Sequence, residues 1–408
     1  MKILQVNNVD LSGARFNGYA TQVHFNKKGI QCNQLVYEKL SEDDKVVSFM
    51  DKIPAINELY KSFENELGIH SMVFPYAHKI LELPVFKEAD IVHYHLLHNN
   101  IMSLLDLPLL INQKPSVWTI HDPWIFTGHC IYPMSCEKYL SGCGQCAYLN
   151  RHFAMKMDNT HSMWMVKKNI LAKLDVDIVV ASKWMFDIVQ ASPLTRHFKR
   201  VHLIPFGIDL AKYAVNAVKK EVCRKKLGIQ SDEFVIFFRS DKSEFKGVQY
   251  IKEMLQHLQC EGKRVVLLTV GEVGLFHEFC DRFRVLDNGW INDEDKLSDL
   301  YAASNVFLMP STAEAFGVMA IEAMAASLPV IVFEGTALPS VVNSPHAGIA
   351  LHKANIDEFV FTVKKLMSNL EFGLELGNAA RKYAEREYDQ QQYYDRLKGL
   401  YEEILKRK

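Results

Sequence analysis

The chain lacks a run of apolar residues long enough to cross a membrane. A spanning helix needs about 20 consecutive apolar residues, and the most apolar stretch of the chain is interrupted by Glu322 and Pro329. The first ten residues, MKILQVNNVD, have no apolar signal-peptide core and match a first β-strand instead. The sequence therefore predicts no membrane span and no export signal.

Charge of one sign is also missing. The formal net charge is -1 at pH 7, which excludes a global field for nucleic acid, so we expect no nucleic-acid partner. Cysteine is sparse, with eight in 408 residues, and without an export signal this predicts reduced thiols and a cytoplasmic protein. Internal repeats and low-complexity segments are absent. At this length we expect two domains of about 200 residues each.

What the sequence does contain is an alternation of strands and helices. Residues 306–333 read as strand, loop, helix and strand, with a helix over about 317–326. Other short β-branched or apolar runs predict strands at 2–7, 30–37, 89–95, 116–122, 177–182, 234–238, 265–271 and 285–291. This pattern predicts an α/β protein with doubly wound parallel sheets. Ligands of such sheets bind at the carboxyl ends of the strands.

Two carboxylates bracket the loop and helix after residue 309. Glu314 precedes the helix and Glu322 lies within it, so about 12 Å of helix separates them. Such a pair can serve two parts of one elongated ligand. A second polar cluster follows the strand at 234–238, where Arg239 and Lys246 precede a helix. Two cations and the free N–H groups of a helix N-terminus form an anion site.

Glu314-Ala-Phe-Gly-Val-Met-Ala-Ile-Glu322, with its flanking PSTAEAFG and EAMA…PVI text, resembles the E-x7-E signature of the retaining family 4 glycosyltransferases, also called glycosyl transferases group 1. The resemblance extends to the segment VHLIPFGID at 201–209, to Lys246-Gly247 and to nearly the whole chain, least at 38–86. It implies the GT-B fold, with two Rossmann-like domains and a cleft between them. We expect an acceptor-side domain at 1–205, a nucleotide-sugar-binding domain at 206–385, and a C-terminal helix at 386–408 that crosses back to the first domain.

The same resemblance implies the donor contacts. Arg239 and Lys246 would hold the diphosphate of a UDP- or GDP-sugar, with Lys242 as a competitor of Lys246. Glu314 would face the sugar hydroxyls, backbone N–H groups of the Phe316-Gly317 loop would reach the sugar or phosphate, and Glu322 would bind the ribose diol. Gly13, in the first strand-to-helix loop, would let the backbone approach phosphate. Because cations neutralise the diphosphate, catalysis would need no metal cofactor.

Histidine at the end of the 116–122 strand supplies a further candidate. His121-Asp122 matches a T-x-H-D motif of the family, which implies that His121 contacts the donor sugar and orients it. His93, His95 and His98 are alternatives. The catalytic set implied by the resemblance is His121, Glu314, Arg239 and Lys246.

Residues 123–147 carry half of the cysteines, at Cys130, Cys136, Cys143 and Cys146, with His129 beside them. The C-x2-C pair has the spacing of a zinc knuckle, but a second such pair is missing. Two interpretations stay open: a structural zinc on four thiolates, or four reduced thiols in a packed loop.

The segment 151–174 has an apolar stripe with lysines beside it, typical of a core-facing amphipathic helix or of a helix on an anionic membrane surface. Overall the resemblance predicts transfer of a sugar to a polyprenyl-linked or oligosaccharide acceptor in surface polysaccharide or lipopolysaccharide O-antigen assembly, with peripheral membrane contact. The alternatives are a sugar-nucleotide epimerase or hydrolase of the same fold and a non-catalytic sugar-nucleotide-binding subunit.

Overall fold

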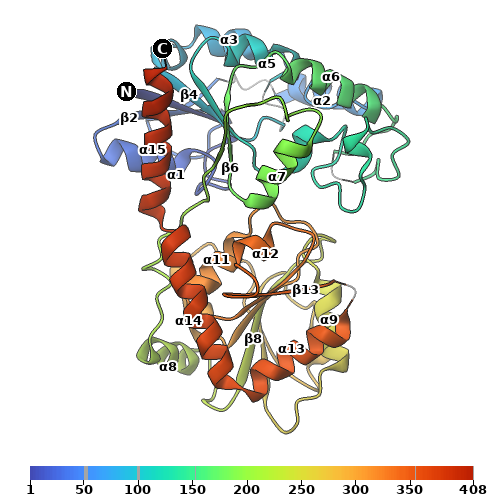
Figure 1. Ribbon diagram of the computed structural model, residues 1–408, viewed down its shortest axis with the longest axis vertical. Helices are drawn as coiled ribbons and strands as arrows, with labels where there is room; N and C mark the ends of the chain where they lie inside the picture. Colours follow the sequence, from blue (N-terminus) through green and yellow to red (C-terminus); the bar gives the residue numbers. More distant parts are fainter. Residues whose placement is uncertain (50–53, 99–101, 152, 354, 408) are drawn as a thin grey trace. The chain divides into compact units, whose positions relative to one another are not determined.

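The computed structural model describes residues 1–49, 54–98, 102–151, 153–353 and 355–407 (Figure 1). The chain forms two compact units. The first comprises Met1–Ile204 together with Tyr394–Lys408, and the second comprises Pro205–Tyr393.

The first unit contains a seven-stranded parallel sheet in the order β3-β2-β1-β4-β5-β6-β7. Three of its strands have four residues each and are buried throughout. Strands of a parallel sheet that is covered by helices on both faces are typically buried in this way. The strands are β1 (Lys2–Val9), β2 (Gln31–Glu38), β3 (Val46–Ser48), β4 (Ile91–Tyr94), β5 (Ser116–Thr119), β6 (Asp177–Val180) and β7 (Val201–Leu203). Strand order reverses direction at the pair β1 and β4, which are hydrogen-bonded neighbours.

Helices connect these strands in the right order for parallel crossovers. They are α1 (Tyr19–Lys27), α2 (Pro54–Leu67), α3 (Ala77–Glu82), α4 (Pro84–Glu88), α5 (Leu107–Ile111), α6 (Thr160–Leu171) and α7 (Lys183–Ala191), with the 3-10 turns η1 (Leu104–Asp106), η2 (Pro123–Phe126) and η3 (Lys138–Leu140). The segment between η2 and α6 has only η3 as regular structure among its described residues.

The second unit contains a six-stranded parallel sheet in the order β10-β9-β8-β11-β12-β13. Its strands are β8 (Phe234–Ser240), β9 (Val265–Gly271), β10 (Arg284–Asp287), β11 (Val306–Met309), β12 (Val330–Phe333) and β13 (Ile349–Leu351). Its helices are α8 (Ala217–Lys226), α9 (Val248–His257), α10 (Glu294–Ala303), α11 (Val318–Ala325), α12 (Leu338–Val341), α13 (Ile356–Ser368) and α14 (Leu370–Glu387), with η4 (His277–Phe279).

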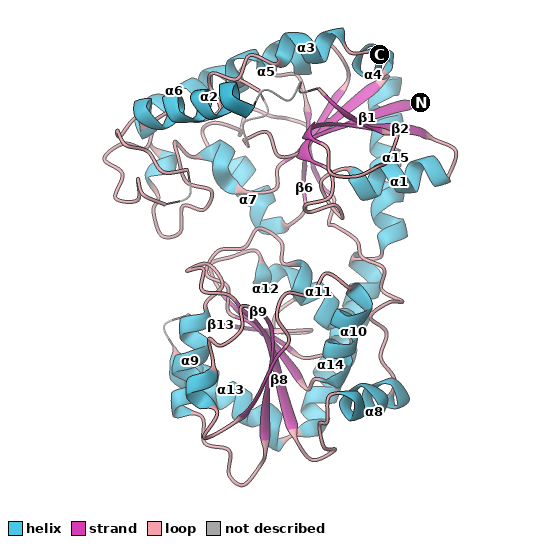
Figure 2. Ribbon diagram, turned by 180° about the vertical axis from the view of Figure 1, so that it is seen from behind, coloured by secondary structure: helices cyan, strands magenta, loops and turns pink. Residues whose placement is uncertain are grey.

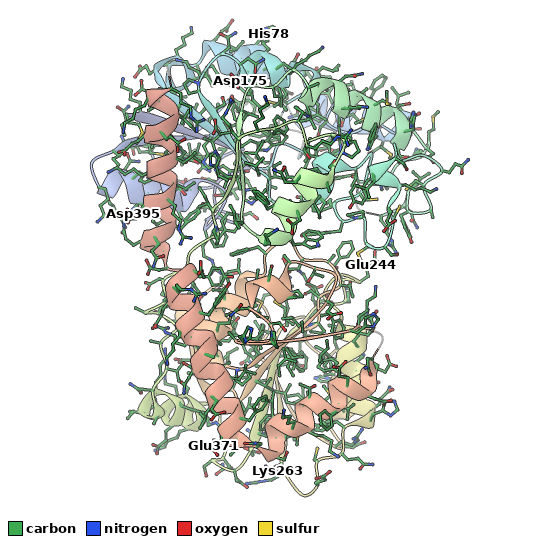
Figure 3. All side chains as sticks on the ribbon, viewed as in Figure 1. His78, Asp175, Glu244, Lys263, Glu371 and Asp395 are labelled. Carbon is green, nitrogen blue, oxygen red and sulfur yellow. The ribbon has the colours of Figure 1, made fainter. Side chains whose placement is uncertain are left out.

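Helices cover both faces of the second sheet (Figure 2). On one face α9 and α13 pack over β8 and β9 in a core that includes Ile236, Ile251 and Phe359. On the other side of the sheet lie α10, α11 and α14 (Figure 2). The labelled side chains of Figure 3 mark the two ends of this unit: Lys263 and Glu371 lie at the end where the strands begin, and Glu244 lies at the end where they finish. The α/β class with two parallel sheets is confirmed.

The last helix, α15 (Gln390–Lys406), packs on the first unit from Tyr394 onward. The Tyr394 ring stacks on His24 of α1 with centroids 3.9 Å apart. The Tyr401 hydroxyl lies 2.5 Å from His93 Nδ1 on β4 and accepts a 3.4 Å hydrogen bond from Gln5 on β1. The C-terminal segment is thus part of the first unit's core.

The edge strands β3 and β13 were not predicted, because three-residue strands carry too few residues for an alternating pattern. In the part of the chain that the structure describes, no helix combines the length and the apolar character that a bilayer crossing requires.

Candidate functional site

The second sheet changes direction between β8 and β11. From β8 the chain builds outward through β9 and β10, and then returns to β11 on the other side of β8. The loops that leave the carboxyl ends of these two strands therefore diverge to opposite faces and leave space between them, the usual ligand position in an open parallel sheet. These loops span 241–247 and 310–317, and they carry the predicted site residues Lys246, Glu314, Phe316 and Gly317.

Direct hydrogen bonds hold the two loops together. Thr312 donates from its backbone N–H to the Phe245 carbonyl (2.9 Å) and from its hydroxyl to the Glu244 carbonyl (3.0 Å). Gly247 begins α9 with φ +71°, and a Cβ at this position would lie 1.9 Å from the Pro310 carbonyl oxygen. Only glycine permits this approach, so the glycine of Lys246-Gly247 fixes how close the loops lie.

Lys246 and Glu314 meet across these loops. Lys246 Nζ lies 3.1 Å from Glu314 Oε2, and the two side chains are 25% and 15% exposed. Lys242, the competing lysine, is 80% exposed and pairs with Glu272 instead, at 3.3 Å. The structure therefore brings Lys246, and not Lys242, to the acidic residue of the E-x7-E segment.

Arg239 is the last-but-one residue of β8 and is held from two sides. Its Nη2 lies 2.7 Å from Asp241 Oδ2, and its guanidinium lies over the Trp290 ring, 4.9 Å from the centroid. Its Nε is buried without a hydrogen-bond partner among the described residues. A buried unsatisfied donor costs about 1–3 kcal/mol, so this N–H is suited to an incoming acceptor. Sequence reasoning missed Trp290, since one aromatic residue in a loop carries no signal by itself.

Glu322 differs from its expected setting. Its side chain is fully buried in α11. Oε1 accepts a hydrogen bond from the Tyr213 hydroxyl (3.1 Å) and Oε2 one from the Tyr301 hydroxyl (2.9 Å). A carboxylate has about four acceptor positions, so two tyrosines do not exhaust it. Ribose binding by Glu322 stays a prediction, and the tyrosine pair was not predicted.

Phe316 and Gly317 form the start of α11. Phe316 is buried and packs edge-to-face on Phe206 (5.0 Å) and Tyr388 (5.8 Å). Phe206, which replaces the asparagine common in the family, is thus an anchor for this loop. Gly317 has φ +97°, and a Cβ there would lie 2.3 Å from Leu338 Cδ2. The buried ring of Phe316 makes its backbone, rather than its side chain, the part suited to a ligand.

In the first unit the loop after β1 contains the predicted Gly13. It has φ +71°, and a Cβ there would meet nothing within 4 Å, so Gly13 serves a turn in open space. The close approach occurs at Gly18, the N-cap of α1, where a Cβ would lie 2.8 Å from Gln5 Cβ and 3.0 Å from His95 Nε2. Gly18 was missed because a lone glycine before a helix is common.

His121 is the last residue in a chain of hydrogen bonds from Gln5 through His95, and this chain determines which ring nitrogen of His121 carries the hydrogen. His95 Nε2 lies 2.8 Å from Gln5 Oε1, so this nitrogen carries the hydrogen and donates it. His95 Nδ1 therefore accepts, and His121 Nε2, 3.2 Å away, donates to it. His121 Nδ1 then bears the lone pair.

Burial keeps these imidazoles neutral. It lowers the pKa of His121 to about 4, with Asp122 opposing and His98 adding to the decrease. It lowers the pKa of His93 to about 3 and that of His95 well below 6.5. His93 is occupied by Tyr401 and by Thr119 Oγ1 (2.7 Å), and His98 Nε2 by Asp122 (2.8 Å). His95 is engaged at both nitrogens, by Gln5 and by His121, and His121 stays the candidate that the T-x-H-D motif favours.

The cysteine-rich segment brings three metal-ligating groups together. Ligand atoms of His129, Cys130 and Cys146 all lie within 4.8 Å of one another. Cys136 and Cys143 are not in this group, although both line the same cavity of about 350 Å3. The four-thiolate zinc site stays a prediction, and the donor set that the structure groups contains a histidine.

The helix of segment 151–174 is α6, and its apolar stripe faces the core. Met163, Trp164, Ile170 and Leu171 are buried. Lys167 is one of the lysines beside the stripe, and a lysine at the edge of such a helix is expected to be solvated; here that expectation is wrong. Lys167 is buried, donates to the carbonyls of Trp124 (2.7 Å) and Thr127 (2.8 Å), and burial lowers its pKa to about 7.

Comparison with known proteins agrees with this geometry. Residues 219–383 match the family model described as glycosyl transferases group 1. Over this segment the chain is similar to the group 1 glycosyltransferases. The matched segment contains both loops of the switch point and the helix with Glu322.

Two curated proteins to which the chain is similar are the uncharacterized glycosyltransferase MJ1607 of Methanocaldococcus jannaschii and the putative colanic acid biosynthesis glycosyl transferase WcaC of Escherichia coli. MJ1607 is 29% identical over 46% of this chain and 50% of the relative. WcaC is 22% identical over 77% of this chain and 76% of the relative. The chain thus spans about half the length of the first relative and three-quarters of the second.

Among solved structures, Anabaena Alr3699/HepE in complex with UDP and glucose aligns with a TM-score of 0.67 at 15% identity, covering 98% of this chain and 99% of that one. This likeness shows the fold, and the predicted GT-B class is confirmed. The cleft between the two domains stays a prediction.

Proposed function

We propose that the chain is a retaining glycosyltransferase that moves a sugar from a nucleoside-diphosphate sugar to a polyprenyl-linked or oligosaccharide acceptor in surface polysaccharide assembly. One observation carries the proposal: Lys246 and Glu314 pair across two interlocked loops at the switch point of one sheet, and Arg239 lies at the end of strand β8, from which the first loop leaves. Support comes from the family match over the same residues and from the similarity to WcaC, which is named as a putative colanic acid biosynthesis glycosyl transferase.

The cations act on the leaving group. As the glycosidic bond breaks, negative charge grows on the diphosphate, and fixed positive charge stabilises the transition state more than the ground state. Arg239 offers the buried Nε donor, with its plane already set by Trp290 and Asp241. Lys246 adds a second charge, so that no divalent ion is required for the step.

Glu314 holds Lys246 at the loop junction and faces the sugar hydroxyls, to which its second oxygen can accept hydrogen bonds. The backbone at Phe316 and Gly317, at the start of α11, contributes N–H groups beside it. Gly13 keeps the phosphate-side role that the resemblance implies. Retention follows front-face attack, in which the departing phosphate takes the proton of the acceptor.

The nucleoside belongs, in this proposal, on the far side of Arg239. A cavity of about 520 Å3 has Trp290, Asn288 and Asn292 in its wall, a size typical of small-molecule sites. Glu322, whose oxygens accept from Tyr213 and Tyr301, serves the ribose diol. Nucleotides with a UDP or GDP moiety are the expected donors, and the HepE structure contains UDP.

His121 keeps the orienting role that the resemblance implies. Because its pKa is about 4, the imidazole is neutral near pH 7 and accepts a hydrogen bond at Nδ1. It does not need to act as a general base, since the leaving phosphate takes the proton. We propose a cytoplasmic location with peripheral contact to the membrane that carries a lipid-linked acceptor.

A donor screen tests the proposal. The purified chain is incubated with a panel of UDP- and GDP-sugars, with and without polyprenyl-linked or oligosaccharide acceptors, and release of nucleoside diphosphate and the shift in Tm are the readouts. The expected result is a rise in Tm with one donor and turnover of that donor that depends on an acceptor, both lost in Arg239→Ala. If a donor binds but is neither transferred nor hydrolysed, whichever acceptor is present, the result favours a non-catalytic sugar-nucleotide-binding subunit. Conversion of the free sugar nucleotide without acceptor favours an epimerase or hydrolase.

A further inference from the structure

The segment between η2 and α6 has little core of its own. In residues 127–151 and 153–159 the buried apolar side chains are Pro133 and Met155, and η3 is the single regular element. A segment of this length without secondary structure is uncommon in a compact domain unless something ties it down. Small regions of this kind are often stabilised by disulfides or a metal.

Disulfides do not supply the tie. All eight cysteines are free thiols in the structure. Instead, three potential metal ligands lie close together. His129 and Cys130 come from the start of the segment, and Cys146 is the second cysteine of the C-x2-C knuckle. Their ligand atoms lie within 4.8 Å of one another, with His129 Nδ1 3.8 Å from Cys130 Sγ.

His129 is oriented as a metal ligand is. Its Nε2 lies 2.8 Å from the Phe153 carbonyl oxygen, which can only accept, so Nε2 carries the hydrogen. The lone pair is then on Nδ1, the nitrogen that faces Cys130. Histidine ligands commonly donate their other N–H to a backbone carbonyl in this way, which fixes the ring and its tautomer.

The sulfurs of the knuckle are also placed for thiolate chemistry. The backbone N–H of Tyr148 donates to Cys146 Sγ (3.4 Å), and that of Gly128 donates to Cys143 Sγ (3.2 Å). Positive φ angles at Cys143 (55°), Gly144 (94°) and Gln145 (47°) curl the turn between the two cysteines. Such N–H groups stabilise a sulfur that carries negative charge.

We propose that this segment binds one structural zinc ion through His129 Nδ1 and the thiolates of Cys130, Cys146 and Cys143. The first three are grouped directly. Cys143 completes the set because it is three residues from Cys146 across the turn, whereas Cys136 belongs to neither the knuckle nor the group. This replaces the four-thiolate arrangement with a Cys3His site.

The charge of the site is matched by its surroundings. Zinc with three thiolates and a neutral imidazole carries a net charge of -1, and each thiol gives up one proton on binding. Lys167 lies within electrostatic reach of Cys143 and Cys130, so an anionic zinc–thiolate site beside it favours the protonated form of Lys167, which balances the charge. Four protein ligands leave no open coordination position, so the ion is structural and takes no part in catalysis.

Zinc binding would therefore link the end of β5, near His121, to the start of α6. His129 lies three residues beyond η2, and the Gly144 N–H donates to Thr160 Oγ1 at the start of α6 (3.0 Å). The inference does not depend on the reaction that the chain catalyses.

Zinc content and the spectrum of its ligands test the site. The full chain, expressed with zinc in the medium, is measured by plasma mass spectrometry and by X-ray absorption at the zinc edge. We expect about one zinc per chain, with three sulfurs at about 2.3 Å and one nitrogen at about 2.0–2.1 Å. Four sulfurs would overturn the Cys3His assignment, and zinc below about one per ten chains would overturn the site.

Matched variants identify the ligands. Cys146→Ser and His129→Gln are expected to lower zinc content at least about tenfold, while Cys136→Ser and the exposed Cys280→Ser retain it. Loss of zinc in Cys136→Ser with retention in Cys143→Ser would contradict the proposed fourth ligand. Because ligand variants can unfold, the wild-type chain is also titrated with a chelator: Tm should fall and recover when zinc, but not magnesium, is added back. An unchanged Tm after the metal has been removed would contradict a structural role.

Discussion

Lys246 Nζ lies 3.1 Å from Glu314 Oε2, while Lys242, four residues earlier, points to Glu272. This difference in direction separates two lysines that are equivalent in the sequence. A half-buried pair at the junction of two loops is suited to exchange one partner for a phosphate oxygen. The exposed Lys242–Glu272 pair contributes little, as surface ion pairs usually do.

The first prediction concerns this choice. Lys246→Ala is expected to lower kcat/KM for the donor at least about 100-fold, the scale of losing about 2.7 kcal/mol of transition-state stabilisation. Lys242→Ala is the matched control and should change kcat/KM less than about threefold. Steady-state kinetics with the donor found in the screen measure both. A larger loss in Lys242→Ala would reassign the loop.

The second prediction concerns how the loops are held. Gly247→Ala places a Cβ against the Pro310 carbonyl oxygen, at a backbone angle that also disfavours alanine, so we expect lower Tm and a loss of activity. Gly262→Ala is the control: its φ is +80°, yet a Cβ there meets nothing within 4 Å. Both variants have the backbone strain of alanine at a positive φ, but only Gly247→Ala adds the steric clash. The difference between their Tm values therefore measures the clash. Equal losses in Tm would show that the approach to Pro310 does not matter.

The third prediction concerns Glu322. Glu322→Ala removes the carboxylate that accepts hydrogen bonds from the buried hydroxyls of Tyr213 and Tyr301, and a hydrogen bond to a charged group contributes about 1.5–3 kcal/mol. We expect a marked fall in Tm together with weaker donor binding. Tyr301→Phe removes one hydroxyl and leaves the carboxylate in place, so stability should fall while the KM for the donor changes little.

Calorimetric unfolding and donor titration of both variants check this separation. If Tyr301→Phe weakened donor binding as much as Glu322→Ala, the tyrosine rather than the carboxylate would be the ribose contact. If Glu322→Ala bound the donor normally, Glu322 would be structural.

The fourth prediction concerns pH. Burial lowers the pKa of His70 and His93 to about 3 and that of His121 to about 4, against about 6.5 in the unfolded chain. As pH falls below about 6.5, the unfolded chain takes up protons that the folded chain refuses, so stability present above that pH is lost. Each histidine lowers the unfolding free energy by up to about 1.4 kcal/mol per pH unit.

Denaturant unfolding between pH 7.5 and pH 5 measures this slope, and His93→Gln should reduce it by about one proton. A free energy that is constant over that range would show that the histidines are protonated in the folded state. Loss of zinc is controlled by measuring metal content at each pH.

Sequence was informative where both faces of an element are covered. The runs at β8, β9 and β11 are continuous β-branched or aromatic residues because helices pack on both sides of the sheet, so their positions were predicted within a few residues. The glutamates and basic residues of the two loops were recognised from their spacing and from the family resemblance. The three-residue edge strands have no such pattern.

Contacts between distant residues were beyond reach. Glu322 is 109 residues from Tyr213, and nothing local indicates that pair. In the sequence Lys167 is a lysine beside an apolar stripe, which is typical of a solvated side chain. Only the fold shows that its ammonium group donates to the carbonyls of Trp124 and Thr127. His129 was adjacent to the cysteines in the text, but its orientation depends on the Phe153 carbonyl, which lies 24 residues away.

The central claim is that Arg239 and Lys246 hold a nucleoside diphosphate without a divalent ion. Isothermal titration of UDP and GDP into the full chain, in buffer to which no magnesium or other divalent salt has been added, tests it most directly. One nucleotide should bind the wild-type chain, and Arg239→Ala should bind it at least about 30-fold more weakly, a loss of about 2 kcal/mol. Equal affinity in the wild-type and Arg239→Ala chains, or binding that requires added magnesium, would contradict the account.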